Sequence, residues 1–278
     1  MKEIKVVIMK SILFVLKENL ENLYRIKSIT KYELKSDVRD TKLGFLWNIL
    51  NPIIQICTFW IVFGIGIRSG KDVDGVAFLP WMIVGMTVWF FVSPCITQGV
   101  GCIYAKRNII TKMKFPVSIL PTTVVTKELF NHLVMLAIIM VFLLCLGFQP
   151  SLYWLQSIYY MVCAFCFCIA LNTITSVLNM FTRDISKLVK ACMRMLLYLT
   201  PILWTLDKIN VSHPQLAFLL KMNPLYYIVE GYRESFFYQV AFYGHYKLTL
   251  YFWVVTIVMY CVGSWLMYKF KSRFIDMM

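Results

Sequence analysis

The sequence has few charged residues over six long stretches that make up most of its 278 residues. Hydrophobic residues account for 60% of the chain and charged residues for 15%, and the two kinds alternate in blocks. Each apolar stretch has about the 20 residues with which a helix crosses a bilayer, and a helix satisfies its own backbone in hydrocarbon. We therefore expect an all-α membrane protein with six transmembrane helices, at residues 45–67, 78–99, 117–147, 152–181, 188–206 and 248–270.

The sequence also lacks the patterns of a nucleotide site and of a catalytic centre. The nearest approach to a phosphate loop is Gly70-Lys71, where Ile65 replaces the first glycine and Asp72 replaces the serine or threonine. The three histidines are far apart, and no H-E-x-x-H or G-x-S-x-G sequence occurs. We expect no catalytic residue, metal or cofactor on this chain, so any work against a gradient needs a partner that supplies the energy.

A long polar segment and a metal-type cysteine pattern are missing as well. The formal net charge of +14 is spread over short segments, whereas a nucleic-acid-binding protein concentrates it on a solvated domain. Cys163, Cys166 and Cys168 form a cluster without converging partners for a metal. We expect one membrane domain over residues 1–278, no nucleic-acid binding, and packing roles for these cysteines.

The basic residues lie mainly on one side of the expected spans. Segments 68–77 and 207–247 hold six of the 28 Lys and Arg residues, and Lys127 lies within a span. The other 21 lie in segments 1–44, 101–118, 182–194 and 269–278. The positive-inside rule then places both termini in the cytoplasm, in a multi-pass protein of the cytoplasmic membrane.

The N-terminal segment is amphipathic. In residues 5–35 apolar side chains recur at helical spacing, while Lys10 and Lys17 take the opposite face with Glu18 and Glu21. Such a helix lies along a membrane surface, although a bundle helix or a partner-binding helix shows the same pattern. Because the apolar residues alternate with Lys and Glu, we expect no cleaved leader here.

Two connections between the spans are more than plain loops. The loop at residues 104–116 is basic and able to form a helix up to Phe115, where Pro116 stops it. It is either a charged loop that sets topology or a short docking helix for a cytoplasmic subunit.

Residues 207–247 are too apolar for an ordinary loop, and Asn223-Pro224 has the residues of a helix start. We expect re-entrant or interfacial helices there, buried in protein or lining a cavity.

Glu230, Arg233 and Glu234 share one face of this outer helix among many aromatic residues. An ordinary surface pair at this spacing adds a few tenths of a kcal/mol. A charged group surrounded by aromatic residues in a membrane protein more often has a function. We favour a polar latch at an outer gate.

Short patches of sequence point to a family when they are taken together. The patches are Leu43-Gly-Phe-Leu-Trp47, Asn51-Pro52, Phe63-Gly-Ile-Gly-Ile-Arg-Ser69, Trp89-Phe-Phe91, Lys112-Met-Lys-Phe-Pro116, Arg183-Asp184, Pro201-Ile-Leu-Trp204, Asn223-Pro224 and Glu230 with Tyr232-Arg233. In this order they resemble the permease subunits of ABC-2-type exporters of cell-surface polysaccharides. Residues 64–69 and 226–233 look more like the wall teichoic acid branch of Gram-positive bacteria than like the related O-antigen branch.

The resemblance implies a homodimer bound to two copies of an ATP-binding subunit, which carry the ATP and Mg²⁺. It also implies a polymer joined through diphosphate to a polyprenyl lipid, which is moved to the outer leaflet. In that family the loop matching residues 104–114 docks on the ATPase. The docking residues would then be Tyr104, Lys106, Arg107, Asn108, Lys112 and Lys114.

A substrate of this kind needs cations for its diphosphate and flat contacts for its polymer. The candidates for the diphosphate are Lys31, Lys35, Arg39, Lys42 and Arg183. Among them Arg183 and Lys42 stand at span ends, and Arg can hold phosphate through two parallel hydrogen bonds. The candidates for the polymer passage are Phe59, Trp60, Phe63, Trp89, Phe91, Tyr198 and Trp204, although aromatic residues also face lipid or pack in the core.

Three other functions share parts of this pattern. An ABC-2 exporter of drugs or lipids has the six spans without needing the polysaccharide-type patches. A membrane transferase acting on polyprenyl phosphate needs acidic ligands, and Asp37, Asp40 and Asp184 show no D-x-D-type pairing. A scaffold without transport activity is the third.

Overall fold

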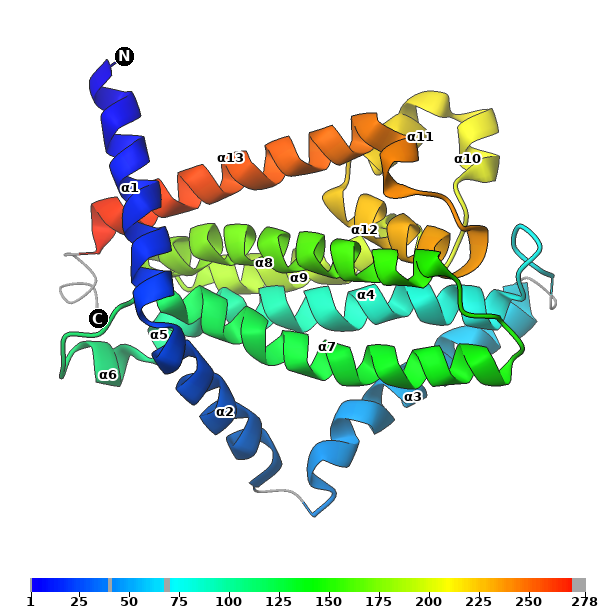
Figure 1. The fold of residues 1–278 in the computed structure, drawn as a ribbon, viewed down its shortest axis with the longest axis horizontal. Coiled ribbons are helices and arrows are strands. Elements are labelled where there is room, and N and C mark those ends of the chain that lie inside the picture. The colour runs from blue at the N-terminus through cyan, green and yellow to red at the C-terminus, as the bar shows by residue number, and fades with distance from the viewer. Residues whose placement is uncertain (1, 40–41, 68–70, 272–278) are drawn as a thin grey trace.

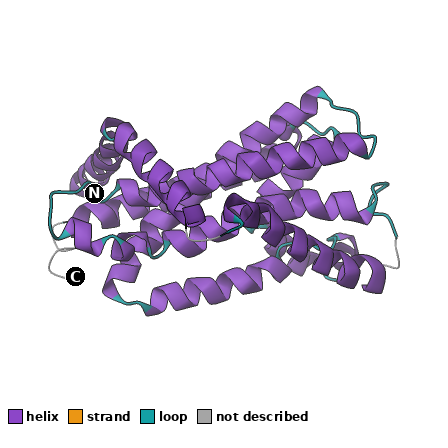
Figure 2. Ribbon diagram, turned by 90° about the horizontal axis from the view of Figure 1, so that it is seen from below, coloured by secondary structure: helices purple, strands orange, loops and turns teal. Residues whose placement is uncertain are grey.

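The computed structural model describes residues 2–39, 42–67 and 71–271, and helices make up nearly all of this part (Figure 1). Figure 2 shows helices and loops without a strand in the described chain. Arg68 and Ser69 of the family-like patch, Gly70 and the tail 272–278 lie outside the described residues. The all-helical class predicted from the sequence is confirmed.

The helices follow one another with short connections. In chain order they are α1 (Lys2–Glu21), α2 (Leu23–Arg39), η1 (Gly44–Leu46), α3 (Trp47–Phe59), η2 (Trp60–Ile67), α4 (Phe78–Gly99), α5 (Cys102–Ala105), α6 (Arg107–Ile110), α7 (Ile119–Cys145), η3 (Leu152–Leu155), α8 (Gln156–Phe181), α9 (Asp184–Leu199), α10 (Asp207–Ser212), α11 (Pro214–Lys221), α12 (Pro224–Arg233), η4 (Glu234–Tyr238), η5 (Phe242–His245) and α13 (Tyr246–Phe270). The segments η2 and η4 are π-helical, and η1, η3 and η5 are 3₁₀ turns.

Five helical segments are long and apolar enough to cross a membrane. They are Gly44–Ile67, Phe78–Gly99, Ile119–Cys145, Leu152–Phe181 and Phe242–Phe270. Their bounds agree with five of the six expected spans to within a few residues, except that the last begins six residues earlier than expected, with η5. Long, mainly apolar sequence was a sufficient signal for these helices, because a segment of this length in hydrocarbon must satisfy its own backbone hydrogen bonds and a helix does so.

The sixth expected span, residues 188–206, is wrong in extent and character. The helix there is α9, which begins at Asp184, ends at Leu199 and carries Lys187, Lys190 and Arg194. At 1.5 Å per residue it is about 24 Å long, less than the roughly 30 Å of a bilayer core. Residues 200–206 continue as an irregular segment, since Pro201 supplies no backbone donor to extend the helix.

The segment 183–202, which contains α9, nevertheless extends from one end of α4 to the other. Arg183, just before α9, contacts Tyr104 in the loop after α4, whereas the carbonyls of Pro201 and Ile202 meet Arg233. Arg233 in turn stacks on Trp81 in the first turn of α4. The two ends of the segment therefore lie at opposite ends of α4, and α9 lies beside α4 and α8 in Figure 1.

The N-terminal amphipathic segment forms two helices rather than one. The chain bends at Asn22, whose amide donates to the carbonyl of Glu18 at 2.7 Å. Helix α1 crosses the end of α13, where Phe14 packs edge-on against Tyr268, and α2 packs against α7 (Figure 1). Apolar residues of α1 remain exposed, so its place on a membrane surface stays a prediction.

Helix α4 is the centre of the bundle and the first span is at its edge. In the most apolar part of α4, 78% of the residues are buried, whereas in that of Gly44–Ile67 only 6% are. Helices α7, α8, α9 and α12 all pack against α4. The first span therefore presents most of its apolar surface outward, and it diverges from the other helices in Figure 1.

The outer segment contains short helices, as the sequence predicts. Asn223 caps α12 by accepting a hydrogen bond from the amide of Leu225 at 3.0 Å, and Pro224 is its first residue. Helix α12 is buried against α4 and α8, and Gly231 allows it to approach the ring of Tyr160. Its backbone is thus covered by protein, as required of a re-entrant segment at membrane depth.

Candidate functional site: a polar cavity among the membrane helices

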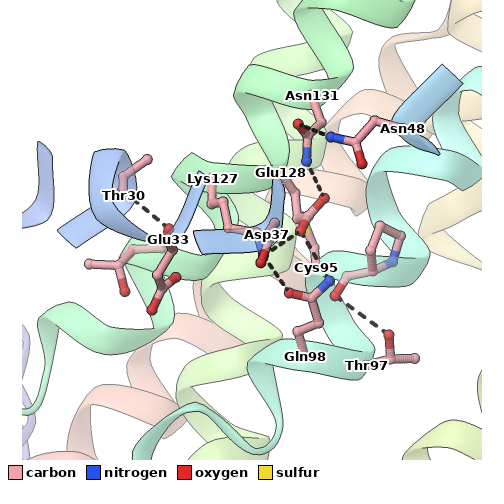
Figure 3. Close-up of polar contacts among 12 residues, drawn as sticks. Thr30, Glu33, Asp37, Asn48, Cys95, Thr97, Gln98, Lys127, Glu128 and Asn131 are labelled. Atoms are coloured by element: carbon pink, nitrogen blue, oxygen red, sulfur yellow. Dashed lines mark hydrogen bonds and ion pairs between the residues drawn. The ribbon is translucent and has the colours of Figure 1, made fainter. Parts of the chain in front are cut away.

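A network of charged groups joins α2, α4 and α7 within the bundle (Figure 3). The ammonium group of Lys127 lies 2.7 Å from a carboxylate oxygen of Asp37 and 3.5 Å from one of Glu128. It also donates to the amide oxygen of Gln98 at 3.1 Å, and the amide nitrogen of Gln98 donates to Glu128 at 3.1 Å. Each buried charge therefore has partners of opposite charge or polarity.

Amide side chains extend this network toward α3. Asn131 donates to the second oxygen of Glu128 at 3.1 Å and accepts from Asn48 at 3.2 Å. Asn131 lies about 18 Å from the start of α7, near the middle of that helix. The polar network therefore reaches the middle of a helix whose second half is almost entirely apolar.

Burial makes these charges costly to hold. Lys127 is 7% exposed and Glu128 is 5% exposed, on a helix of membrane-spanning length. An ionised side chain at the centre of a membrane helix costs about 2.5–3.5 kcal/mol on insertion scales, and such residues usually mark a pathway or a binding site. The charged network around Lys127 and Glu128 is costly to bury and fully hydrogen-bonded, which makes it a candidate functional site.

The network borders a cavity of about 370 Å³ between α2, α3, α4 and α7. Polar side chains, Asn51, Gln55, Ser93 and Thr97 among them, share its lining with Trp47 and Trp89. From Gln98 to Trp89 the cavity follows α4 for about 14 Å. It therefore combines amides, hydroxyls and indole rings within the spans.

The predicted passage residues divide between this cavity and other places. Trp89 is 7% exposed and lines the cavity, whereas Phe91 is 1% exposed and its ring stacks on His132 in the core. Phe91 therefore has no open face in this conformation. The rings of Phe59 and Phe63 pack together on the outlying first span.

The remaining passage candidates lie on exposed or irregular chain. Trp60 is 38% exposed at the start of η2. The indole of Trp204 donates to the carbonyl of Tyr198 at 2.8 Å, and the Tyr198 ring is exposed. The seven aromatic residues therefore do not form one continuous wall within the described chain.

At the end of the bundle near α1, two predicted sites meet on one ring. Tyr104 was assigned to docking and Arg183 to the diphosphate, yet the Arg183 guanidinium lies 4.4 Å from the centre of the Tyr104 ring and donates to its hydroxyl. Arg107 lies 4.5 Å from the same centre. Lys106 forms an ion pair with Glu33 of α2 at 2.7 Å. This basic surface links the loop after α4 to α2 and to the turn before α9.

The single docking helix expected up to Phe115 is wrong in extent. Two one-turn helices, α5 and α6, occupy this loop, and the second ends at Ile110. Asn108, Lys112 and Lys114 are exposed there and available to a partner.

The other predicted diphosphate ligands lie on α2 and just after it. Lys31, Lys35 and Arg39 are exposed and spaced four residues apart, which places them on one face of the helix. Lys42 is exposed before η1. No ion pair or hydrogen bond joins them to Arg183 within the described residues.

Of the predicted gate residues, Arg233 is buried at 1% exposure. Its guanidinium donates to the carbonyls of Pro201 and Ile202 at 2.8 Å each, contacts Glu230 at 3.3 Å and lies 3.4 Å from the centre of the Trp81 ring. The expected Glu230–Arg233 pair is thus present, but Arg233 chiefly holds the irregular segment after α9 against α12.

Glu234 does not join that pair. Its carboxylate lies 2.8 Å from the ring of His245. Burial raises the pKa of Glu234 to about 7, even though His245 lowers it. A carboxyl group in this place holds its proton more readily than one in water.

Sequence reasoning placed Lys127 within a span but did not connect it with Asp37, Glu128 or Gln98. A charged residue inside an apolar stretch was the available signal, since it requires a buried partner. The partners lie 29 to 90 residues away along the chain, apart from Glu128. In the described part of the chain no group of three His, Cys, Asp or Glu residues could hold a metal ion.

The long apolar helices and the polar cavity between them define a multi-pass membrane protein with an interior built for polar contact. A family model for ABC-2 type transporters matches residues 24–237. The chain belongs to this family of membrane permeases, which makes it a transport subunit and implies an ATP-binding partner subunit and a place in the cytoplasmic membrane.

Similar proteins carry a more specific name. An O-antigen export system permease protein RfbA of Klebsiella pneumoniae is 28% identical over 251 residues, which cover 90% of this chain and 93% of that protein. The protein of the same name from Myxococcus xanthus is 27% identical over 210 residues, covering 76% of this chain and 79% of that one. This chain is therefore related to O-antigen export permeases along most of its length.

Proposed function

We propose that this chain is the permease subunit of an ABC transporter that exports a cell-surface polysaccharide linked through diphosphate to a polyprenyl lipid. The names of its relatives favour an O-antigen-like polymer over the wall teichoic acid that the sequence patches suggest. The observation that carries the proposal is the polar cavity, because an apolar drug or lipid gains little from buried amides and carboxylates.

The working complex in this proposal has two copies of the chain and two ATP-binding subunits, which carry the ATP and Mg²⁺. With both termini in the cytoplasm, as the positive-inside rule predicts, the ATPase would dock on the basic surface around Tyr104, Arg107, Lys112 and Lys114. That surface is contiguous with α2 through the ion pair of Lys106 with Glu33. Movement of the ATPase would thereby reach the cavity, since α2 also supplies Asp37.

The substrate's diphosphate would enter beside the basic face of α2 formed by Lys31, Lys35 and Arg39, with Lys42 following it. Arg183 would take part through its stacked arrangement with Tyr104. At the opposite end, Arg233 would hold the outer gate closed by donating to the Pro201 and Ile202 carbonyls, with Glu230 as its ion-pair partner. Glu234 would belong to the same gate through its contact with His245.

Wall teichoic acid export in a Gram-positive bacterium is the second candidate. It is supported by the likeness in sequence of residues 64–69 and 226–233 to that branch. The two candidates share the lipid and the diphosphate and differ in the polymer, which is an uncharged or weakly charged glycan in one and a chain of repeating phosphates in the other.

Reconstitution with the ATP-binding subunit tests the proposal. We expect ATP turnover to rise with a diphospho-polyprenyl glycan and to stay at its basal rate with bare polyprenyl phosphate. Stimulation by apolar drugs with no response to the glycan lipid would contradict the proposal and favour a small-molecule exporter. If the chain forms no complex with the ATP-binding subunit, the proposed role as its permease subunit is contradicted.

A further inference from the structure

The polar cavity has the chemistry of a sugar site rather than of a phosphate site. A sugar hydroxyl both donates and accepts hydrogen bonds, and so do amide side chains when both of their ends are used. The cavity offers amides from α3 and α7, hydroxyls from α4 and two indole rings. Its volume of about 370 Å³ lies within the range of small-molecule sites, about 300–1,000 Å³.

We propose that this cavity binds one neutral, hydroxyl-rich sugar unit of the exported polymer and disfavours repeat units that carry phosphate. The inference rests on the proposed function and adds to it the location of a polymer-binding subsite and the charge of the unit that it accepts. It also distinguishes the two candidate polymers, since only one of them has a phosphate in each repeat.

The charges around the cavity argue against an anion. Asp37 and Glu128 line it, and Lys127 is the cation between them, which leaves one negative charge in excess. An ammonium group has three donors, and Lys127 already has three acceptors, on Asp37, Gln98 and Glu128. A phosphate entering the cavity would meet two carboxylates and no available cationic donor.

The groups open to a sugar lie on α3. Asn51 and Gln55 line the cavity, are exposed, and are four residues apart on the same face of the helix. Neither side chain makes a hydrogen bond to another residue in the described ranges 2–39, 42–67 and 71–271. Their polar ends are therefore not needed for folding and remain available to a ligand.

Trp47 and Trp89 provide apolar faces at the same cavity. Trp47 is 40% exposed on α3, and Trp89 lines the cavity from α4. The C–H face of a sugar ring packs on an aromatic ring, while its hydroxyls reach polar groups at the edge. This pairing of ring faces with amides suits a ligand that is apolar on its faces and polar at its rim.

Binding to the full-length protein in lipid nanodiscs tests the inference. Three probes share one diphospho-polyprenyl anchor: one carries a neutral tetrasaccharide, one carries four glycerol phosphate units and one carries no polymer. We expect the neutral probe to bind at least about tenfold more tightly than either of the others, since several hydrogen bonds add to the affinity of the anchor.

Two variants and a matched control assign the binding to the cavity. Asn51→Ala with Gln55→Ala should remove most of the advantage of the neutral probe and leave binding of the bare anchor unchanged. Gln215→Ala, an exposed amide on α11 outside this cavity, should change neither. Asp37→Asn with Glu128→Gln makes the excess charge positive and should strengthen binding of the glycerol phosphate probe several-fold.

The outcomes separate this inference from the proposed function. Equal or tighter binding of the glycerol phosphate probe to the native protein would overturn the inference, as would an unchanged preference in the Asn51 and Gln55 variant. Either result leaves polymer export standing if a lipid-linked polymer still stimulates ATP turnover. If no lipid-linked polymer of either kind binds or stimulates, the proposed function fails as well.

Discussion

Replacing Lys127 by methionine removes the cation shared by Asp37 and Glu128 while keeping an unbranched side chain of similar length. The loss is largest for Glu128, which is 5% exposed and would keep only its amide partners, Gln98 and Asn131. Removing one partner of a buried pair costs about 3–5 kcal/mol. Because the Asp37 side chain is 47% exposed and water can solvate it, we expect the lower end, about 3 kcal/mol.

Glu128→Gln in the same protein should restore much of this stability. A neutral amide at residue 128 still accepts from Gln98 or Asn131 and no longer needs a cation. We expect the Lys127→Met, Glu128→Gln protein to be only about 1 kcal/mol less stable than the native one, since replacing both members of a buried pair is often close to neutral. The recovery on the second substitution is what identifies an unpaired charge as the cause.

Equilibrium unfolding in mixed detergent micelles, followed by tryptophan fluorescence, measures the four proteins of this cycle. Asp184 and Lys187 on α9 provide the control, because this pair lies at 3.1 Å with both side chains largely exposed, and we expect no measurable coupling between them. The reasoning is refuted if Lys127→Met costs no more than the control substitution, or if Glu128→Gln lowers stability further in its presence.

Three further variants test other parts of the structure. Lys112→Glu with Lys114→Glu should abolish stimulation of the ATPase and leave membrane insertion intact, as co-purification and ATP turnover will check. Gly231→Ala places a methyl group against the ring of Tyr160, so unfolding in micelles should show a loss of about 1–3 kcal/mol. Burial raises the pKa of Glu234 from its ordinary value of 4.5 to about 7. The folded protein therefore favours the protonated carboxyl, and the resulting stability is fully present below pH 4.5 and is lost as the pH rises through about 7. Glu234→Gln should therefore be more stable than the native protein at pH 8, with the difference closing as pH falls.

Each of these has a control within the same chain. Reversing the charges of Lys221 and Lys247 in the outer segment should leave ATPase stimulation intact, and equal loss there would contradict docking at Lys112. Gly66→Ala meets only ordinary contact at 3.6 Å and should not destabilise the protein, so an equal loss at both glycines would refute close packing of α12. A difference between native and Glu234→Gln proteins that does not vary with pH would refute the account of Glu234.

Local patterns in the sequence predicted much of the fold. Five apolar stretches became helices of spanning length, and the Asn223-Pro224 start of α12 was read correctly, because each depends on residues close together in sequence. The bend at Asn22 and the split of the loop into α5 and α6 were missed. Both depend on contacts with α13, α7 and α8 that helical periodicity does not contain.

Helix α9 shows where an apolar criterion fails. Its charged residues lie between Asp184 and Arg194 and its last turn is apolar, so a prediction that followed apolar content moved the span toward residue 206. The true path is set by contacts at its two ends, Arg183 with Tyr104 and Arg233 with Pro201. Arg233 binds main-chain carbonyls, which every residue has. The side chains of the residues that it contacts therefore do not indicate the contact in the sequence.

The candidate site was the least predictable part. Lys127 signalled a buried partner, but only the packing of α2 on α7 selects Asp37 from the acids of the N-terminal segment. Aromatic content suggested a passage lined by rings, whereas the cavity takes most of its character from amides that were not considered. Polar residues inside spans are thus a better guide to such a site than aromatic residues, which also serve as core and lipid contacts.

Transport of a lipid-linked glycan across a vesicle membrane is the most direct test of export. The chain and its ATP-binding subunit are reconstituted in liposomes with a labelled diphospho-polyprenyl glycan, whose exposure is read with a glycosidase on the side opposite the ATPase. We predict ATP-dependent appearance of cleavable glycan on that side, at a lower rate in the Asn51 and Gln55 variant. ATP hydrolysis without any such appearance, for neutral and phosphate-rich polymers alike, would contradict the account.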